Sequence, residues 1–375
     1  MKILFVDNSL QMFMNFRGNI VNSFLNSGYD VSVVIPNLEK KVPENVPANL
    51  NIIQIEANPH GFNPFKDFKY FMSLYKFYHK IKPDIIFHYT IKPNIYGSLA
   101  ASLLNIKNVS IIAGLGYAFN GTGLRKQVAK RLYRFALKRT SKAIVLNKAN
   151  YNFLLENSYL PKEKLLLFKG GEGVDLEIFK PLFQTSETLT LLLVSRLLYD
   201  KGLIEFLKAA ELVKDKNPEV IFEILGPEGG NSPMAFPLDE IKKYEEKKII
   251  KYLGSTDNVM PFLNRPGTVV VLPSYHEGLS RSLMEACATG CPIIASDIPG
   301  CQETVNEGVS GFLVEPKNPN ALAEAMFKMI SLSPEKRAQM GLMGRLKAEN
   351  EFDVNEVINT YYQVINELNE TKSKK

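Results

Sequence analysis

The chain has 375 residues, of which 45% are hydrophobic and 22% are charged. This length is enough for two domains, and the composition is typical of a globular protein rather than a disordered or fibrous one. No uncharged apolar stretch approaches the ~18 residues that a membrane-spanning helix needs. The short apolar run at residues 1–6 is followed directly by polar residues, so it predicts a buried first strand rather than a signal sequence. The sequence therefore favours a chain that does not cross a membrane.

The three cysteines, Cys287, Cys291 and Cys301, lie in one short region of the chain. Their number is odd, and no matching Cys/His pair accompanies them as in a zinc site. We therefore expect reduced packing residues in a cytosolic protein, with no disulfide and no bound metal.

The two halves of the chain have opposite net charge. Residues 1–180 contain 24 Lys and Arg against 12 Asp and Glu, and the remaining residues contain 21 against 27. A basic half suggests an anionic partner such as phospholipid, pyrophosphate or nucleic acid. The alternative is that these charges only keep the surface solvated.

In the first half, apolar runs alternate with helical stretches. Strands are expected at residues 2–6, 29–36, 51–56, 83–89, 109–113 and 143–147. This alternation predicts an α/β protein with a doubly wound parallel sheet. Ligands of such sheets gather at the carboxyl ends of the strands.

Three segments that follow these strands are candidate ligand contacts. Residues 7–17 are expected to form a loop after the first strand, before a helix over 18–25, and Arg17 at its end could meet the pyrophosphate of an acceptor. His88 and Lys92 come at the end of the strand at 83–89, where polar substrate contacts are expected. A surface role for Arg17 and a core role for His88 remain open.

Two stretches of the first half could meet a membrane surface. Residues 62–78 contain eight aromatic side chains, and residues 124–142 contain eight basic residues, no acidic ones and an apolar stripe at helical spacing. Such helices suit the surface of an anionic membrane. The alternatives are aromatic residues in the core and a merely solvated basic face.

The second half contains a pair of cations after a strand. A continuous apolar strand at residues 189–194 precedes Arg196, and Lys201 follows on the strand-to-helix turn. An Arg and a Lys so placed can converge on one diphosphate, although an isolated pair is more often a surface pair. The strands expected at 220–225 and 249–253 end in Gly226 and Gly254, which let the backbone approach a ligand closely.

A strand at residues 268–272 is followed by a loop and a helix expected from about 279 to 289. The backbone N–H groups of Gly278, Leu279 and Ser280 would then lie at a helix N-terminus, which favours a phosphate. Glu277 and Glu285 could accept hydrogen bonds from hydroxyls. A phosphate with several hydroxyls describes a nucleotide sugar, and an ordinary βα unit with solvated acids is the alternative.

These residues lie in PSYHEGLSRSLMEACATGCPIIASD, at 273–297, which resembles the signature of the family 4 retaining glycosyltransferases. The segments SRLLYDKG at 195–202 and KGGEGVD at 169–175 resemble further family motifs, and the resemblance covers most of the chain. Two departures stand out: the loop at 7–17 lacks the usual Gly-Gly pair, and Glu172 replaces a small or amide residue. The first departure leaves open whether that loop contacts the donor phosphate.

The resemblance implies a GT-B fold, in which two Rossmann-like domains face a central cleft. The acceptor domain would comprise residues 1–181 and the nucleotide-sugar domain residues 182–352, with a helix at 353–375 crossing back to the first domain. The implied catalytic residues are Glu277, Arg196, Lys201 and His88. The implied donor contacts are Glu285, Gly278, Leu279, Ser280, Gly226 and Gly254, and the implied acceptor contacts are Arg17, Lys92 and Gly116.

The implied reaction is metal-independent transfer of an N-acetylhexosamine or galactose from a UDP-sugar to a polyprenyl-diphosphate-linked glycan, with retention by front-face attack. Cations beside the leaving diphosphate would stabilise the transition state more than the ground state. The enzyme would lie in the cytoplasm, peripherally on the inner face of the plasma membrane, and would bind no nucleic acid. The alternatives are another GT-B enzyme, such as a nucleotide-sugar epimerase, and a non-enzymatic polyanion-binding protein.

Overall fold

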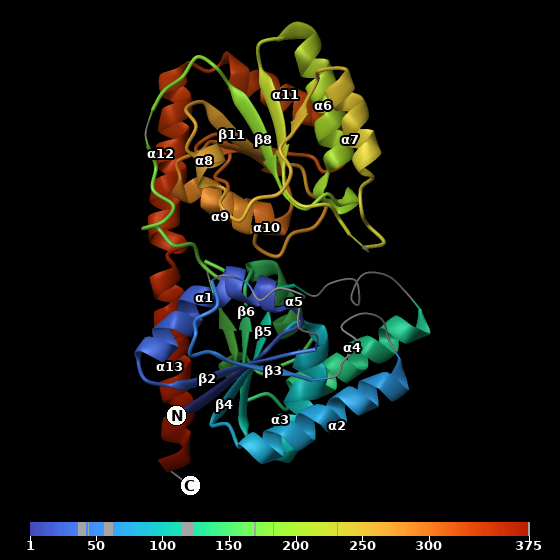
Figure 1. Cartoon of the computed structure of the whole chain (residues 1–375), viewed down its shortest axis with the longest axis vertical. Helices are drawn as coiled ribbons and strands as arrows, with labels where there is room; N and C mark the ends of the chain where they lie inside the picture. The colour runs from blue at the N-terminus through green and yellow to red at the C-terminus, as the bar shows by residue number, and fades with distance from the viewer. Residues whose placement is uncertain are drawn as a thin grey trace. The chain divides into compact units, whose positions relative to one another are not determined.

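The computed structural model describes residues 1–36, 43, 45–55, 63–114, 123–168, 170–182, 184–230 and 232–373 (Figure 1). The chain forms two compact units. The first unit comprises Met1–Glu172 together with Val354–Lys375, and the second comprises Gly173–Asp353. The sequence predicts a boundary between residues 181 and 182, whereas the two units divide between Glu172 and Gly173.

The first unit contains a seven-stranded parallel sheet with the strand order β3-β2-β1-β4-β5-β6-β7. Its strands are β1 (Lys2–Val6), β2 (Asp30–Ile35), β3 (Asn51–Gln54), β4 (Ile85–Tyr89), β5 (Lys107–Ile112), β6 (Lys142–Val145) and β7 (Leu165–Leu167).

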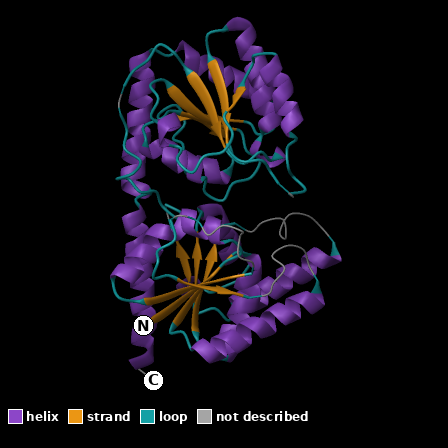
Figure 2. Cartoon of the chain, in the orientation of Figure 1, coloured by secondary structure: helices purple, strands orange, loops and turns teal. Residues whose placement is uncertain are grey.

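Helices cover both faces of this sheet (Figures 1 and 2). They are α1 (Leu10–Asn26), α2 (Pro64–Ile81), the π-helix η1 (Pro93–Gly97), α3 (Ser98–Leu103), α4 (Leu124–Leu137), α5 (Lys148–Glu156), η2 (Lys162–Lys164) and α13 (Val354–Ser373). Side chains alternate between the faces: Ile3 and Phe5 pack with α1 and α13, and Leu4 and Val6 pack with α2 and α3.

Helix α1 begins earlier than the sequence pattern predicts. The expected loop at residues 7–17 is helical from Leu10, because the hydroxyl of Ser9 accepts a hydrogen bond from the backbone N–H of Met12 and caps the helix. Arg17 therefore lies about two turns into a helix rather than on a loop. Helix α4 ends at Leu137, and the expected continuation to residue 142 is a turn that leads into β6.

The second unit contains a six-stranded parallel sheet with the order β10-β9-β8-β11-β12-β13. The strands are β8 (Thr190–Val194), β9 (Ile221–Leu225), β10 (Lys251–Tyr252), β11 (Thr268–Leu272), β12 (Ile293–Ser296) and β13 (Gly311–Val314). The helices are η3 (Tyr199–Lys201), α6 (Leu203–Lys216), α7 (Leu238–Glu246), α8 (Met260–Leu263), α9 (Arg281–Ala288), α10 (Pro299–Gln302), α11 (Pro319–Ser331) and α12 (Pro334–Glu351).

Each sheet has one topological switch point, where the chain continues to one side of a strand and later returns on its other side. In the first unit this point lies between β1 and β4, and in the second it lies between β8 and β11. Ligands of open parallel sheets bind beyond the carboxyl ends of the strands at such points. The fold thus indicates one candidate position in each unit. Within the described residues, no helix has the length and apolar character needed to span a bilayer.

Candidate functional site

In the second unit, the segments that follow β8 and β11 are joined at the switch point. The backbone N–H of Tyr275 donates to the carbonyl oxygen of Asp200 at 2.8 Å. Gly202, which caps η3, has φ of 73°, and a Cβ atom there would clash with the carbonyl oxygen of Pro273. Only glycine fits this position, because it tolerates both the left-handed conformation and the close approach. The glycine thus lets the two segments pack directly together.

This packing brings Lys201 and Glu277 into contact. The Nζ atom of Lys201 lies 2.6 Å from Oε1 of Glu277, and the hydroxyl of Ser274 donates to the same oxygen at 2.7 Å. The side chains of Lys201 and Glu277 are 18% and 10% exposed. Arg196 is exposed, and within the described part of the chain its side chain has no ion-pair or hydrogen-bond partner. The site therefore presents one paired and one unpaired cation.

Glu277 is also supported from the side of α10. A Cβ atom at Gly300 would lie 2.6 Å from the carbonyl oxygen of Gly278 and 2.8 Å from Cβ of Glu277. Such distances are too short for a real contact, so glycine is required for this packing. Lys201, Ser274 and the backbone at Gly300 together fix the position of the Glu277 carboxylate.

Helix α9 begins at Arg281, two residues later than the sequence predicts, with Ser280 as its N-cap residue. Gly278 and Leu279 therefore lie on the approach to the helix. The first backbone N–H groups of a helix have no partner within it, and they favour an anion. Glu277 lies four residues upstream of Arg281, so the start of the helix is close in sequence to the pair of Lys201 and Glu277.

Glu285 is the fifth residue of α9, about one turn from its start. Its Oε1 atom accepts a hydrogen bond from Nε of Arg281 at 2.8 Å. Burial raises the pKa of Glu285 above its ordinary value, although the charge of Arg281 acts in the opposite direction.

The two glycines predicted to line the donor pocket lie together. The backbone N–H of Gly226 donates to the carbonyl oxygen of Gly254 at 2.8 Å. A Cβ atom at Gly226 would clash with the carbonyl oxygen of Ser195, which directly precedes Arg196. Gly226 therefore allows the segments after β9, β10 and β8 to meet at the same edge of the sheet.

Three supporting residues of the second unit, Ser274, Tyr275 and Glu205, were not among the predicted site residues. Ser274 lies only three positions before Glu277, so proximity in sequence was a usable signal. Tyr275 donates to both carboxylate oxygens of Glu205 at 2.8 Å. Glu205 is 70 residues away in the sequence, and no local pattern indicates that contact.

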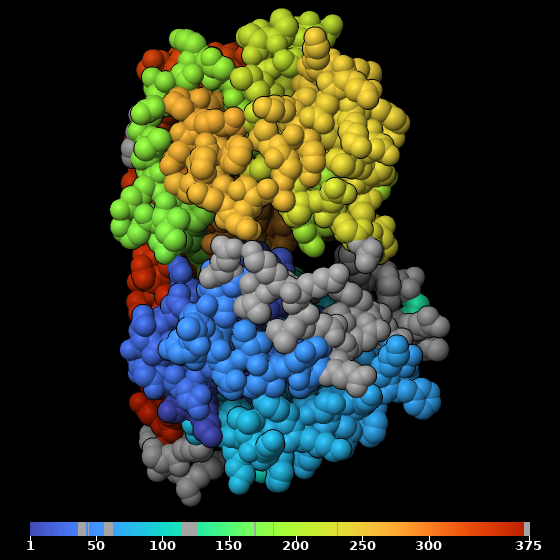
Figure 3. Space-filling model, in the orientation of Figure 1, coloured from blue at the N-terminus to red at the C-terminus, as the bar shows by residue number. Residues whose placement is uncertain are grey.

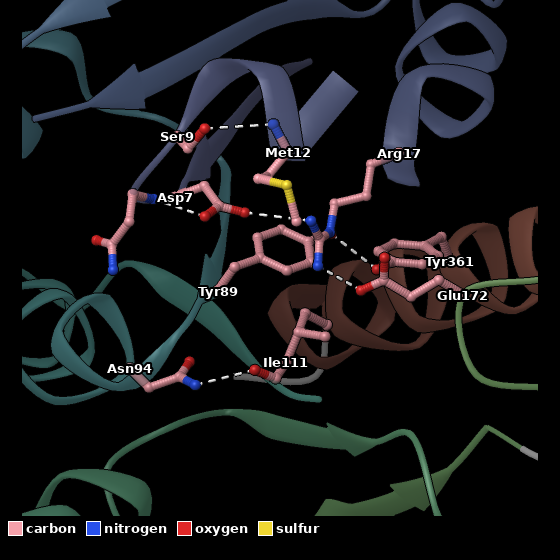
Figure 4. Close-up of polar contacts among 10 residues, drawn as sticks. Asp7, Ser9, Met12, Arg17, Tyr89, Asn94, Ile111, Glu172 and Tyr361 are labelled. Atoms are coloured by element: carbon pink, nitrogen blue, oxygen red, sulfur yellow. Dashed lines mark hydrogen bonds and ion pairs between the residues drawn. The ribbon is translucent and has the colours of Figure 1, made fainter. Parts of the chain in front are cut away.

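At the switch point of the first unit, Arg17 lies between two carboxylates (Figure 4). It donates to Asp7 at 3.3 Å and to Glu172, and its guanidinium lies 4.0 Å from the centre of the Tyr89 ring. Arg17 is only 7% exposed. The hydroxyl of Tyr361 on α13 lies 2.8 Å from the hydroxyl of Tyr89. Glu172 departs from the family pattern, as described above, but its pairing with Arg17 was not predicted.

The pKa shifts in this cluster follow from burial and charge. Burial raises the pKa of Asp7 above its ordinary value, and the charge of Arg17 only partly opposes this effect. Burial by itself would lower the pKa of Arg17, but the carboxylates of Glu172 and Asp7 raise it. Arg17 thus remains positively charged, and its charge is already balanced by its neighbours.

The expectation that His88 faces a sugar is wrong for this structure. His88 has no exposed surface, since it lies within β4 and its side chain points into the core. Its Nε2 atom lies 3.0 Å from the hydroxyl of Tyr78, and its Nδ1 atom lies 3.4 Å from the hydroxyl of Ser98. Burial lowers the pKa of His88 to about 3, so the ring is neutral. His88 is therefore a core histidine.

The two remaining acceptor candidates have different outcomes. Nζ of Lys92 lies 2.8 Å from Oδ1 of Asp67, on the first turn of α2, so its charge is paired within the first unit. Gly116 lies outside the described residues. No group of three or more His, Cys, Asp and Glu side chains that could hold a metal ion occurs in the described parts of either unit.

Two family models match the chain in sequence. The model described as glycosyl transferases group 1 matches residues 175–347, and the model described as glycosyl transferase 4-like matches residues 2–147. The first match includes Arg196, Lys201, Glu277 and Glu285, and the second spans the switch point of the first sheet.

Similar proteins agree with these matches. N,N'-diacetylbacillosaminyl-diphospho-undecaprenol alpha-1,3-N-acetylgalactosaminyltransferase of Campylobacter jejuni is 28% identical, over 86% of this chain and 88% of that protein. UDP-Gal:alpha-D-GlcNAc-diphosphoundecaprenol alpha-1,3-galactosyltransferase of Escherichia coli is 29% identical, over 70% of each chain. The structure of Anabaena HepE in complex with UDP-glucose is similar over 100% of both chains, with a TM-score of 0.76 and 18% identity. The chain belongs to the family 4 glycosyltransferases of the GT-B fold.

Proposed function

We propose that this glycosyltransferase moves a hexose or N-acetylhexosamine from a UDP-sugar to a polyprenyl-diphosphate-linked glycan, with retention of configuration. The donor half of the proposal rests on one observation, the ion pair of Lys201 and Glu277 at the switch point of the second sheet. The two relatives described above act on diphosphoundecaprenol-linked sugars, and their names support the acceptor half. The UDP-glucose complex of HepE supports a UDP-linked donor.

The reaction requires charge stabilisation at the leaving group. When the anomeric carbon loses a nucleoside diphosphate, positive charge develops on the sugar and negative charge on the leaving oxygen. Lys201, Arg196 and the backbone N–H groups at the start of α9 would stabilise that negative charge as it forms. These groups supply positive charge without a metal ion.

The carboxylates would orient the donor. Glu277 keeps lone pairs that a sugar hydroxyl can use, since Lys201 and Ser274 both contact its Oε1 atom. Glu285 would accept from the ribose hydroxyls, and Gly226 and Gly254 would let the backbone lie close to the base. We assign no carboxylate as a nucleophile. Retention would therefore proceed by attack of the acceptor on the face of the donor sugar from which the diphosphate leaves.

The acceptor would bind to the first unit at its switch point. Because Arg17 is buried and paired with two carboxylates, it would hold the segment after β1 in place rather than bind the acceptor diphosphate. The acceptor would meet the exposed groups beyond the ends of β1 and β4.

The test is a transfer assay with the full-length chain. UDP-galactose, UDP-N-acetylgalactosamine, UDP-glucose and UDP-N-acetylglucosamine are each incubated with an undecaprenyl-diphosphate-linked sugar in detergent. We expect one or two donors to add a single sugar to the lipid, detected by mass, with the α linkage identified by NMR. Absence of lipid-linked product with every UDP-sugar, or a β-linked product, would contradict the proposal.

We also propose that α4 holds the first unit on an anionic membrane surface. Arg131 on this helix and Lys138 at its C-cap are exposed, and Phe65 and Phe68 on α2 are 89% and 64% exposed. Helix α2, in light blue, contributes to the face seen in Figure 3. Exposed aromatic residues near basic ones favour the interface of an anionic bilayer.

Changing Arg131 and Lys138 together to Glu is expected to release the protein from vesicles that contain phosphatidylglycerol, because each basic residue near such a surface contributes about 1 kcal/mol. Co-sedimentation with the vesicles measures the effect. The control variant changes Lys208 and Lys328, which are exposed in the second unit, to Glu and so alters the net charge equally. If both variants sediment like the unchanged protein, α4 is not the membrane contact.

A further inference from the structure

Thr90, the residue directly after β4, has an unusual backbone conformation. Its φ is 64°, in the left-handed region. This region is unfavourable for residues branched at Cβ, and a β-branched residue there is a genuine outlier. Strained residues of this kind cluster at binding and catalytic sites, where the surrounding structure holds them in place.

The other non-glycine residues of the first unit with positive φ do not lie directly after a strand. Lys82, Asn105 and Ser158 have φ of 50° to 54°, and each lies in the turn that follows a helix and leads into a strand. Left-handed residues are common at the ends of helices, where they satisfy the last carbonyl groups. Among the described non-glycine residues with positive φ, Thr90 alone is β-branched, and in this unit it alone lies at the carboxyl edge of the sheet.

Thr90 also lacks the local role that its sequence position suggests. Its carbonyl oxygen accepts the first bond of the following helical turn, from the backbone N–H of Asn94 at 3.1 Å. A threonine before a helix commonly caps it with its hydroxyl, but this requires an extended backbone. Within the described part of the chain, the hydroxyl of Thr90 has no hydrogen-bond partner, and the residue is exposed. The hydroxyl is therefore available to a ligand.

The surroundings of Thr90 agree with a binding role. It lies at the switch point between β1 and β4, and the π-helix η1 follows it three residues later. Short π-helical segments occur frequently at functional sites. The charge of Arg17, which covers the ring of the preceding residue, Tyr89, is balanced by Asp7 and Glu172. The guanidinium of Arg17 is thus already paired with carboxylates, and the exposed neutral hydroxyl of Thr90 suits a sugar better than a phosphate.

We infer that Thr90 is a specificity residue for the acceptor, and that its hydroxyl binds a hydroxyl of the acceptor sugar. This inference rests on the proposed transfer to a lipid-linked glycan and names one contact in that acceptor site. The left-handed backbone keeps the hydroxyl from capping the following helical turn, and the side chain is exposed.

Three substitutions distinguish the effect of losing the Thr90 hydroxyl from the effect of relieving its backbone strain. Thr90→Val keeps the branched shape but removes the hydroxyl, Thr90→Ser keeps the hydroxyl, and Thr90→Gly removes both the side chain and the strain. We expect Thr90→Val and Thr90→Gly to raise the KM for the lipid-linked acceptor about tenfold, the effect of losing one hydrogen bond, without raising the KM for the UDP-sugar. Thr90→Ser should stay within about threefold of the unchanged enzyme.

Thermal unfolding distinguishes binding from folding. Thr90→Gly is expected to leave Tm unchanged or to raise it, because glycine adopts positive φ without strain. The matched control is Ser158→Gly, which relieves a similar φ of 54° at another exposed hydroxyl residue, and it should leave both KM values unchanged.

Each outcome has a separate meaning. An unchanged acceptor KM in Thr90→Val and Thr90→Gly, with an active unchanged enzyme, overturns the role of Thr90 while the proposed function stands. An equal rise in the donor KM assigns the residue to the donor instead and also overturns the inference. If the unchanged enzyme transfers no sugar to the lipid acceptor, the proposed function fails and the inference fails with it.

Discussion

Lys201→Ala is expected to lower kcat about 100-fold, because it removes a fixed positive charge beside the oxygen that leaves with the nucleoside diphosphate. The loss should appear mainly in kcat, since the interaction is stronger in the transition state than in the bound substrate. The ion pair with Glu277 makes the effect larger than the loss of one cation, because Glu277 then keeps only Ser274 as its partner at that oxygen. Steady-state transfer rates with saturating donor and acceptor measure this change.

Lys208→Ala is the matched control for Lys201→Ala. Lys208 is exposed on α6, the helix that follows η3, so its loss removes the same charge from the same region without touching the site. Its kcat should be that of the unchanged enzyme. A thermal scan of Lys201→Ala should show a Tm near that of the unchanged protein. Near-normal kcat in Lys201→Ala would remove this residue from the leaving-group site.

The strands of both sheets could be predicted well because parallel strands are buried on both faces and appear as continuous apolar runs. The runs at residues 2–6 and 268–272 have the same limits as β1 and β11. Their alternation with helices predicted a doubly wound sheet in the first half, and the family resemblance implied a second one. The strand orders of the two sheets confirm that fold class. The resemblance and the family assignment also favour a transferase over the epimerase and the polyanion-binding protein.

The contact between Lys201 and Glu277 was predictable in part. Both residues follow buried strands, but the sequence alone could not show that β8 and β11 are neighbours in the sheet. The strand order joins two segments 76 residues apart in the chain. Motif resemblance compensated for this missing information, because it assigned both residues to one ligand.

The environment of Arg17 could not be predicted from local patterns. Ser9 before the apolar residues of α1 was a usable signal for a helix start, and it would have placed Arg17 on a helix. The pairing with Glu172, however, spans 155 residues and depends on where the first unit ends. The predicted substrate contact of His88 was wrong for a similar reason. Its partners Tyr78 and Ser98 come from helices on one face of the sheet, and no local pattern indicates these contacts.

Arg17→Met is expected to lower the free energy of unfolding by about 3–5 kcal/mol, because it leaves the buried carboxylates of Asp7 and Glu172 without their positive partner. Methionine fills most of the space beside Tyr89, so the loss reports charge rather than a cavity. In thermal unfolding this corresponds to a decrease in Tm of roughly 10 °C. Arg131→Met, an exposed arginine on α4, is the control and should change the stability by less than about 0.5 kcal/mol.

The loss of stability in Arg17→Met should depend on pH in a defined direction. Burial already raises the pKa of Asp7 in the folded protein, and Arg17 is the charge that opposes this rise. Without Arg17, the folded-state pKa of Asp7 rises further above its unfolded value. Because the folded state then favours the protonated form, the deficit is fully present above that raised folded-state pKa and shrinks as pH falls through it toward the unfolded value.

Urea unfolding at pH 7 and at pH 5 measures this dependence, and the difference in stability between Arg17→Met and the unchanged protein should be smaller at pH 5. The double variant Arg17→Met with Glu172→Gln should recover part of the loss at pH 7, because it removes one of the two uncompensated carboxylates. A deficit below about 1 kcal/mol at pH 7, within the range of an exposed ion pair, would show that Arg17 does not tie Asp7 and Glu172 together. Recovery in the double variant would instead identify the pairing of α1 with the end of the first unit as the source of the stability.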